Sequence, residues 1–226
     1  MSKSYVVIGA SKGIGEALTQ KLEADDHHVI GVSRTPANSS SWLQSDVTTD
    51  EGIDAIVSHL AGKKIDALLY MAGAWEENAF TDDYDFLQSP RSETKSIIAL
   101  NMVAPILLVQ ALIENLSQAN NPKIILMGST SGLDNTRPKE VAYTASKFGL
   151  RGVSQSLSQV LKPHNIHTTI INPGDVATPE VIEDCRNNGS STSGLIPLAD
   201  LINTIDWVLQ SPTEALPTEI NVFDKR

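Results

Sequence analysis

Tyr143 and Lys147 are the two residues of this sequence whose types and spacing most directly indicate chemistry. They stand four positions apart in the segment Tyr-Thr-Ala-Ser-Lys, at the start of a predicted helix, so both lie on one face of it. A tyrosine side chain titrates at about pH 10, so acid-base work near neutral pH requires roughly 4 kcal/mol of preferential phenolate stabilisation. The neighbouring ammonium can supply it. The pair therefore predicts a tyrosine that acts as a general acid or base.

Ser129 and Asn101 are the polar residues that we expect to complete this candidate catalytic site. Ser129 follows a predicted strand and precedes Tyr143 by 14 positions, which places its hydroxyl where it can hold a substrate oxygen. Asn101 lies in a very apolar helix, four residues before Pro105. Because proline has no N–H, we expect the Asn101 carbonyl to lose its donor and the helix to kink, which leaves a site for a water molecule.

Each of these four residues also has an ordinary structural interpretation. Ser129 can cap a turn, and Asn101 can bond to neighbouring backbone. Tyr143 can be half-buried core, and Lys147 can be a solvated helix residue. All four follow a glycine-rich turn near the start of the chain that is typical of cofactor binding, and this order favours the catalytic interpretation.

Three glycines, Gly9, Gly13 and Gly15, follow the first predicted strand and open the first predicted helix. Glycine permits a tight turn and removes the Cβ that would hold a phosphate away, while the N–H groups and dipole of the helix start attract an anion. The spacing differs from the G-x-G-x-x-G fingerprint, and no Gly-Lys-Ser/Thr of a P-loop follows. We predict a cofactor phosphate site here, with a plain tight turn as the alternative. Its other members are Ser11, Lys12 and Ile14.

The end of the second predicted strand indicates which dinucleotide binds. Proteins that prefer NAD carry an acid there for the ribose hydroxyls, whereas this chain has Ser33 followed by Arg34. Arg34 can bind a 2′-phosphate in a bidentate manner, and Lys12 adds a second positive charge. We therefore predict NADP(H) as the cofactor. The alternative is that both cations are solvated surface residues.

The elements that must position these residues alternate along the whole chain. Short β-branched or aliphatic runs predict strands at Tyr5–Ile8, Val29–Val32, Ala67–Tyr70, Ile124–Met127, Thr168–Ile171 and Ile220–Phe223. Helical patterns fill the intervals, at about 13–24, 50–61, 93–118, 142–162 and 197–210. This rhythm predicts an α/β fold, with one Rossmann-type domain over residues 1–226 in which helices cover both faces of a doubly wound parallel sheet.

Two polar stretches interrupt this rhythm, and we expect them to form substrate loops, at about 74–92 and 178–196. Both follow strand ends, which is where ligands bind in open α/β sheets. Residues 186–194 are small and polar and are expected to be mobile. Several residues of the first stretch either line the substrate space or pack in an ordinary way. They are Trp75, Phe80, Tyr84, Phe86 and Arg91.

Composition and charge narrow the classes of function. The 226 residues carry 17 Lys and Arg against 27 Asp and Glu, a formal net charge of −10, which argues against nucleic acid as a partner. Cys185 is the single cysteine, and the five histidines lack ligand spacing, so we expect no disulfide and no metal site. The most apolar window, Ile97–Ile113, is short for a membrane span, and no secretory signal is visible. We expect a cytoplasmic protein.

From Tyr5 to about Thr178, the sequence resembles the short-chain dehydrogenase/reductase family. The glycine turn matches that family's turn, and Asp46-Val47 matches its pair at the adenine pocket. The residues that match its catalytic tetrad are Asn101, Ser129, Tyr143 and Lys147. The resemblance implies that Lys147 also binds the nicotinamide ribose hydroxyls, beside Tyr143, and that Asn101 holds a water in a proton relay.

Further parts of the family pattern lie at two later strand ends. Ala72-Gly73 matches the end of its N-N-A-G segment. Pro173-Gly174 with Thr178 matches the P-G-x-x-x-T element, which by resemblance holds the nicotinamide carboxamide. The chain departs from the pattern at Ile8, which replaces a threonine, and at Tyr70-Met71, which replaces two asparagines. We expect the hydrogen bonds of those residues to be lost or rerouted.

Together these features predict an NADP(H)-dependent oxidoreductase that interconverts a carbonyl compound and a secondary alcohol, both small molecules. Hydride would pass between the nicotinamide and the carbonyl carbon, while Tyr143 exchanges the proton and Ser129 orients the oxygen. The alternative is an NADP(H)-binding regulatory or scaffold protein that kept the fold and lost turnover.

The apolar helix Ile97–Ile113 also predicts self-association. It is apolar around nearly its whole circumference, and the next helix offers the small residues Ala145, Gly149 and Val153 on one strip. Pairing both helices with their copies about a two-fold axis would bury this surface, and the resembled family often assembles in that way. We expect a homodimer or a tetramer built from it. The alternative is that other elements of the same chain cover the remaining apolar surface of this helix.

Overall fold

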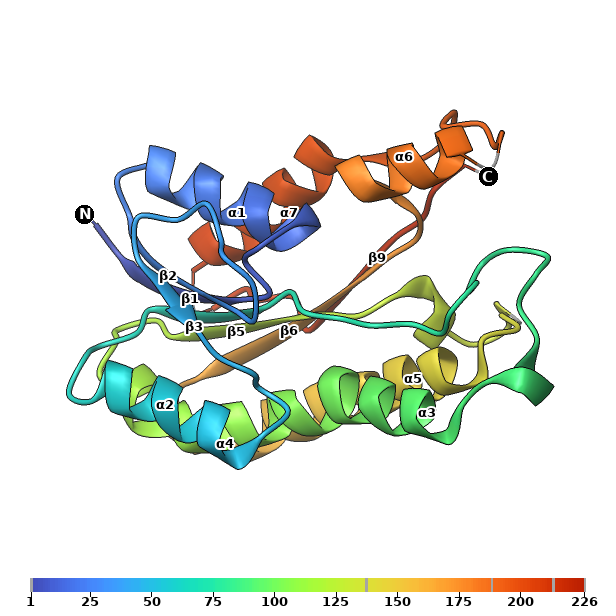
Figure 1. Cartoon of the computed structure of the whole chain (residues 1–226). Coiled ribbons are helices and arrows are strands. Elements are labelled where there is room, and N and C mark those ends of the chain that lie inside the picture. The colour runs from blue at the N-terminus through green and yellow to red at the C-terminus, as the bar shows by residue number, and fades with distance from the viewer. Residues whose placement is uncertain (1, 137, 188, 213, 226) are drawn as a thin grey trace.

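The computed structural model describes residues 2–136, 138–187, 189–212 and 214–225 (Figure 1). In these residues a seven-stranded parallel sheet has the order β3-β2-β1-β4-β5-β6-β9. Its strands are β1 (Ser4–Ile8), β2 (His28–Ser33), β3 (Trp42–Gln44), β4 (Ala67–Tyr70), β5 (Lys123–Met127), β6 (His167–Pro173) and β9 (Glu219–Val222). Two short strands, β7 (Val176–Ala177) and β8 (Ile196–Pro197), pair separately.

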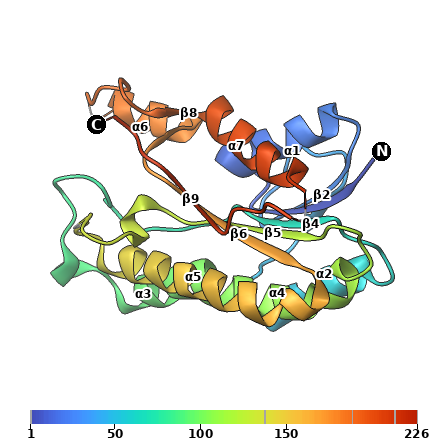
Figure 2. The ribbon, with the colours of Figure 1, turned by 180° about the vertical axis from the view of Figure 1, so that it is seen from behind.

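Helices cover both faces of the sheet (Figures 1 and 2). One layer contains α1 (Gly13–Ala24), α6 (Pro179–Asn187) and α7 (Leu198–Gln210). The other contains α2 (Asp50–Leu60), α3 (Arg91–Ile98), a π-helical segment (Ala99–Val103), α4 (Ala104–Leu116) and α5 (Val141–Val160). The predicted doubly wound α/β fold is therefore confirmed.

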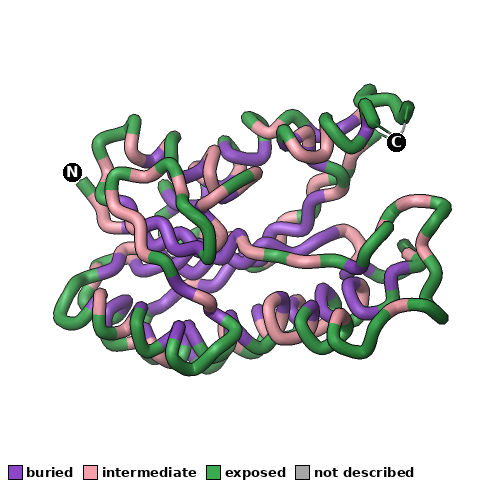
Figure 3. The backbone as a smooth tube through the Cα atoms, in the orientation of Figure 1, coloured by how far each residue is buried: buried purple, intermediate pink, exposed green. Residues whose placement is uncertain are grey.

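Strand residues alternate between the two layers of core, because successive side chains point to opposite faces of the sheet. Val6 and Leu68 pack with Leu108 on the α4 side, whereas Val7 and Leu69 pack in the other core, with α1 and α7. Figure 3 shows the buried strands between helices whose outer sides are exposed. Burial on both faces explains why the strands read as nearly continuous apolar runs.

The order of the strands fixes where a ligand can bind. The chain runs outward from β1 to β2 and β3, and then returns to place β4 on the other side of β1. At such a reversal, the loops that leave the carboxyl ends of the two strands diverge and open a crevice. The glycine turn after β1 and Ala72-Gly73 after β4 leave the sheet at this point.

The segment around 178–196 is more regular than we expected. It contains the helix α6 and the strand β8, in place of a continuous loop. Pro179 stands at the first helical position, where its missing N–H is harmless, and Cys185 is the buried residue of this helix. The short strands β3, β7 and β8 were also missed, because two or three residues carry too little periodicity to be recognised.

The expected kink before Pro105 takes a different form. Residues Ala99–Val103 are π-helical, and the N–H of Ala104 donates to the carbonyl of Ala99. In this register, the carbonyl that faces the missing N–H of Pro105 is that of Leu100. The hydroxyl of Tyr70 donates to the Leu100 carbonyl at 2.6 Å. The Leu100 carbonyl is therefore a group that Pro105 deprives of a donor, and the expected rerouting at Tyr70 is found. The freed carbonyl of Asn101 stays a prediction.

The continuous helical run Arg91–Leu116 is long and apolar enough, by length and composition alone, to cross a membrane. Core helices of soluble proteins meet the same criterion. Here Leu108, Leu112 and Leu116 of α4 are completely buried in the core cluster below the sheet. The run thus serves as a packing element between α2 and α5 (Figure 2).

Candidate active site

A cleft of about 880 Å³ opens at the carboxyl ends of the strands. It collects most of the residues that the sequence singled out, although they come from separate parts of the chain. Those that line it are Gly9, Ser11, Lys12, Gly13, Ile14, Ser33, Arg34, Asp46, Val47, Ala72, Gly73, Ser129, Tyr143, Lys147, Pro173, Gly174 and Thr178. Gly15 and Asn101 lie behind its wall, where both are buried.

The glycine turn has the geometry that its sequence predicted. Gly9 has φ +86° and Gly13 has φ +56°, both in the region that favours glycine. A Cβ on Gly9 would lie 2.7 Å from the backbone nitrogen of Ala72, and one on Gly15 would overlap with the Gly9 carbonyl oxygen. The turn is therefore compressed against β4, and the first turn of α1 faces the cleft.

The end of β2 places Arg34 in the cleft, and the side chain of the preceding Ser33 is held by hydrogen bonds. Ser33 accepts the indole N–H of Trp42 at 2.9 Å and donates to the carbonyl of Thr35. Arg34 is mostly exposed, and its guanidinium lies 3.9 Å from the carboxylate of Asp46. The hydroxyl of Thr48 holds the pKa of Asp46 below its usual value, and Arg34 acts in the same direction. Arg34 is thus available to an anion but already has one acidic neighbour.

Ser129, Tyr143 and Lys147 come together at the other end of the cleft, and all three are nearly buried. The ammonium of Lys147 lies 5.5 Å from the centre of the Tyr143 ring and donates to the carbonyl of Met127, at the end of β5, at 2.9 Å. Ser129 hydrogen-bonds to the Tyr143 side chain. The three residues that the sequence placed in one catalytic group therefore share one site.

The protonation of this site differs from our expectation. Burial raises the pKa of Tyr143 to about 12, and nearby carboxylates add to this, whereas the hydrogen bond with Ser129 lowers it. Burial also lowers the pKa of Lys147 to about 8. The Tyr143 pKa is therefore raised where we expected it to be lowered, and the largest cause is the burial of the phenol. At neutral pH the site holds a neutral phenol beside an ammonium.

Asn101 supports this group from behind. Its side-chain oxygen accepts the N–H of Ala74 at 2.9 Å, and its amide donates to the carbonyl of Ala74 and to the hydroxyl of Ser146. Ser146 in turn donates to the Tyr143 carbonyl at 2.6 Å. Asn101 thus connects the loop after β4 to the helix that carries Tyr143. Its role in a water relay stays a prediction.

The Pro173-Gly174 element is held from the end of the chain. The carboxylate of Asp224, just after β9, accepts the N–H of Asp175 at 2.9 Å. A Cβ on Gly174 would overlap with the same carboxylate, so a larger residue here would require Asp224 to move. The N–H of Lys225 donates to the carbonyl of Gly194. The segment after β9 therefore ties the predicted nicotinamide element to the chain before β8.

Two buried carboxylates near Tyr143 were missed by the sequence analysis. Glu76 accepts the N–H groups of Ala142 and Tyr143, at the start of α5, at 2.7 and 3.2 Å. Glu140 accepts the N–H of Phe80 at 2.8 Å. The signal for them was weak, because both stand in polar stretches that read as solvated loop. Only the fold shows that these stretches meet.

Aromatic side chains of the loop after β4 form the rest of the wall at this end. Trp75 and Phe80 line the cleft, as one of our two interpretations predicted. Phe86 and Arg91 are exposed and lie outside the cleft lining, and the hydroxyl of Tyr84 instead accepts the N–H of Val141. Opposite them, the stretch Asp175–Ser190 contributes three carboxylates. These belong to Asp175, Glu180 and Asp184.

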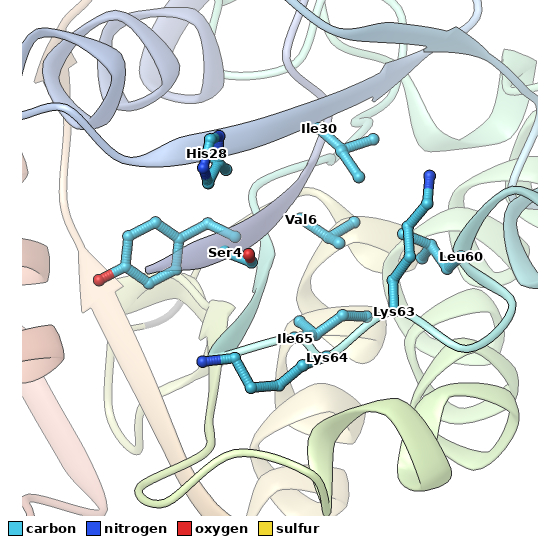
Figure 4. Close-up of a pocket in the computed structure, with 9 residues that line it drawn as sticks. Ser4, Val6, His28, Ile30, Leu60, Lys63, Lys64 and Ile65 are labelled. Atoms are coloured by element: carbon cyan, nitrogen blue, oxygen red, sulfur yellow. The ribbon is translucent and has the colours of Figure 1, made fainter. Parts of the chain in front are cut away.

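A second, smaller hollow of about 310 Å³ lies at the opposite end of the sheet, where β1 and β2 begin (Figure 4). Its floor contains Val6 and Ile65, and Lys63 and Lys64 extend away from each other at its rim (Figure 4). Lys64 pairs with Asp66 at 3.1 Å. Polar groups do not converge on this hollow as they do on the cleft, so the cleft is the candidate active site.

Comparison with known proteins identifies the family. A family model described as short chain dehydrogenase matches residues 3–188. Carbonyl reductase family member 4 from Xenopus laevis is 26% identical over 229 residues, which cover 94% of this chain and 93% of that protein. The matched range includes the glycine turn and the group around Tyr143.

Solved structures show the same fold at low sequence identity. A mutant of 4-hydroxyisoleucine dehydrogenase complexed with NADH and succinate has a TM-score of 0.84 and 23% identity, covering 98% of this chain and 96% of that one. ElxO with NADP bound has a TM-score of 0.85 and 18% identity, covering 99% and 98%. One of these proteins was solved with NADH and the other with NADP.

Proposed function

This chain belongs to the short-chain dehydrogenase/reductase family, and from that premise we propose that it is an NADP(H)-dependent oxidoreductase that interconverts a carbonyl compound and a secondary alcohol. The observation that carries the proposal is the buried group of Ser129, Tyr143 and Lys147 at one end of a cleft whose other end is a glycine turn. A neutral phenol that hydrogen-bonds to a serine and lies beside an ammonium is a proton donor for a carbonyl oxygen.

The cleft fits a dinucleotide along its length. A Cβ on Gly13 would meet the side chain of Thr178 at 3.7 Å, so the glycine leaves room between the helix start and the predicted nicotinamide element. The first turn of α1 offers backbone N–H groups to a phosphate. Glu180 brings a carboxylate to the same turn, where a bound phosphate would meet it. The wide groove with glycines at its floor supports a nicotinamide cofactor as the ligand.

The chain's own residues provide the proton chemistry. A nicotinamide cofactor supplies the hydride to the carbonyl carbon or removes it from the alcohol carbon. During reduction Tyr143 donates its phenol proton to the carbonyl oxygen, which becomes the alcohol hydroxyl, and Ser129 holds that oxygen by a hydrogen bond. Lys147 stabilises the phenolate until it is protonated again. Burial keeps Tyr143 protonated at neutral pH, which is the form that donates the proton in reduction.

Preference for NADP(H) over NAD(H) rests on charge. Lys12 and Arg34 are exposed cations that line the phosphate end of the cleft, and Ser33 takes the place of an acid. A guanidinium can bind a 2′-phosphate through two parallel hydrogen bonds. The neighbouring Asp46 is 3.9 Å away, so its attraction for Arg34 is weaker than that of a closely bound phosphate.

We also propose that two copies associate through the layer of α4 and α5. Gly149 is partly covered within the chain, because Met102 occupies the space that a Cβ would need. Apolar surface nevertheless stays exposed on this layer, at Val103, Ile106, Leu107 and Phe148, each between 36% and 40% exposed. Its burial in a two-fold interface would remove these side chains from water.

The proposed activity can be tested by following NADPH and NADH oxidation at about 340 nm against aldehydes and ketones, with Tyr143→Phe as the comparison. We expect turnover by the wild type and its loss in the variant, while cofactor affinity, measured by titration, stays within about twofold because Phe keeps the ring packing. If the variant kept more than about a tenth of wild-type kcat, Tyr143 would not be the main proton donor. Tight cofactor binding without turnover by the wild type would favour the regulatory alternative.

A further inference from the structure

Three aromatic rings meet at the substrate end of the cleft. The centre of the Phe80 ring lies 5.4 Å from that of Tyr143, and the centre of the Trp75 ring lies 6.4 Å from it, both nearly edge-on at 84° and 88°. Trp75 and Phe80 also contact each other at 6.3 Å. These distances are typical of favourable aromatic pairs. The proton donor is thus one member of an aromatic cluster.

The two outer rings of this cluster are open to a ligand. Trp75 is 52% exposed and Phe80 is 53% exposed, although both line the cleft, whereas Tyr143 is only 9% exposed. Large aromatic side chains gain by covering apolar surface, so half-exposed rings beside a reaction site are a place for an apolar group of the ligand.

The loop that carries these rings is held in place at several points. Asn101 binds both backbone groups of Ala74, and Glu76 binds the start of α5. Phe80 has a left-handed backbone with φ +64°, which is rare for a bulky residue, and its N–H donates to the buried Glu140. Strain of this kind persists only where the surroundings impose it, and it occurs at ligand sites. The rings are therefore presented in a preorganised position.

The facing wall carries negative charge. Asp175, whose charge adds to burial in raising the pKa of Tyr143, and Asp184 line the cleft on that side, while Lys147, a cation of the substrate end, is buried and donates to Met127. A carboxylate on the substrate would share this cleft with these acids and would be repelled. A flat neutral group would not be repelled.

We propose that Trp75 and Phe80 form a specificity site for a flat aromatic substituent on the carbonyl substrate, and that the acidic facing wall excludes substrates that carry a carboxylate. This inference rests on the proposed function, because it places the reacting carbonyl beside Tyr143. The substrate class is thus an uncharged aromatic aldehyde or ketone, reduced to the corresponding alcohol.

The first test compares substrates matched in size. We expect kcat/KM for benzaldehyde to exceed that for cyclohexanecarbaldehyde, whose ring is puckered. Trp75→Leu and Phe80→Leu should each lower kcat/KM for benzaldehyde about three- to tenfold, mainly through KM, and change it for cyclohexanecarbaldehyde less than about twofold. Phe86→Leu is the matched control, because Phe86 is 55% exposed in the same loop but outside the cleft lining, and it should change neither. Equal losses for both aldehydes would overturn the aromatic site.

The second test addresses charge and separates this inference from the proposed function. At low salt, kcat/KM for methyl 4-formylbenzoate should be at least about tenfold higher than kcat/KM for 4-carboxybenzaldehyde. The ratio of the two values should decrease as the salt concentration increases. Equal use of the two would overturn the exclusion of carboxylates.

Binding can be measured without turnover, by titrating benzamide and cyclohexanecarboxamide calorimetrically into the cofactor-saturated protein. Preferential binding of benzamide that is lost in Trp75→Leu would support the aromatic site even if no carbonyl compound is reduced. Absence of reduction would then contradict the proposed function but not the aromatic site. Equal binding of the two amides would overturn the site whether or not the enzyme turns over.

Discussion

The carboxylate of Glu76 caps the helix that carries Tyr143, since it accepts the Tyr143 N–H at 3.2 Å and the Ala142 N–H at 2.7 Å. Residue Glu140, which precedes α5, provides no side-chain cap of its own. The second oxygen of Glu76 is buried without a hydrogen-bond partner. A residue 67 positions earlier in the chain thus holds the helix start and places negative charge near the proton donor.

Changing Glu76 separates these two effects. Glu76→Gln keeps an oxygen that can accept both N–H groups but removes the charge, so the phenolate is less disfavoured and the pH at which alcohol oxidation becomes half-maximal should fall. Glu76→Ala should also lose the cap and about 1–2 kcal/mol of stability. The measurement is a pH profile of kcat/KM for alcohol oxidation, alongside thermal unfolding. An unchanged profile in Glu76→Gln would show that Glu76 acts through structure alone.

Reduction should decline as pH rises through about 8. Burial lowers the pKa of Lys147 to about 8, so the ammonium that stabilises the Tyr143 phenolate is present below that pH and lost above it. Tyr143, with its pKa raised to about 12, stays protonated through this range and does not cause the decline. The measurement is kcat for carbonyl reduction between about pH 6 and 10. In Lys147→Met the rate should be low and show no such decline; a decline that persisted would belong to another group.

Tyr70→Phe should destabilise the fold. The phenol of Tyr70 donates to the carbonyl of Leu100, whose other donor position is taken by Pro105, so the variant leaves a partly buried acceptor without this donor. The expected loss is about 1–3 kcal/mol, or about 2–10 °C in Tm for a chain of this size. Tyr84→Phe is the matched control, because its 3.3 Å hydrogen bond to Val141 is exposed and should cost less than about 1 kcal/mol. Equal Tm values for Tyr70→Phe and wild type would contradict the role of Tyr70.

Arg34→Ala should weaken use of NADPH much more than use of NADH. Loss of a charge-assisted contact with the 2′-phosphate costs about 1.5–3 kcal/mol, which is roughly ten- to over a hundredfold in kcat/KM. The measurement compares kcat/KM for both cofactors in wild type and variant. Arg91→Ala controls for net charge, because Arg91 is exposed at the start of α3 and lies outside the cleft lining. Equal use of NADPH and NADH by the wild type would contradict the proposed preference.

Ile106→Glu or Phe148→Glu should convert a dimer, or a tetramer built from it, into smaller species. Both side chains are exposed on the layer proposed to pair, and a buried charge there would be costly. Trp207→Glu is the matched control, because Trp207 is 57% exposed on α7, in the layer that covers the other face of the sheet. Sedimentation at micromolar concentration measures the mass. A wild-type species near the chain mass of 24.3 kDa would refute the proposed assembly.

The order of helices and strands and the catalytic candidates could be predicted, because each leaves a pattern in a short stretch of sequence. Buried strands read as apolar runs, the glycine turn is defined by residues 9–15, and Tyr143 and Lys147 are neighbours on one helix face. Ser129 could be added because it follows a strand, and parallel strands end at the same edge of the sheet. These features depend on a few adjacent residues, so the sequence by itself determined them.

Tertiary structure decided the features that depend on contacts between distant segments. The pKa of Tyr143 is set by burial, which the four-residue spacing to Lys147 does not reveal. In the π-helical register the Leu100 carbonyl faces Pro105, and its hydrogen bond comes from Tyr70, 30 positions earlier. Glu76 and Glu140 became part of the site only when the loop after β4 was placed against α5. Such contacts join residues tens of positions apart, and a local pattern carries no record of them.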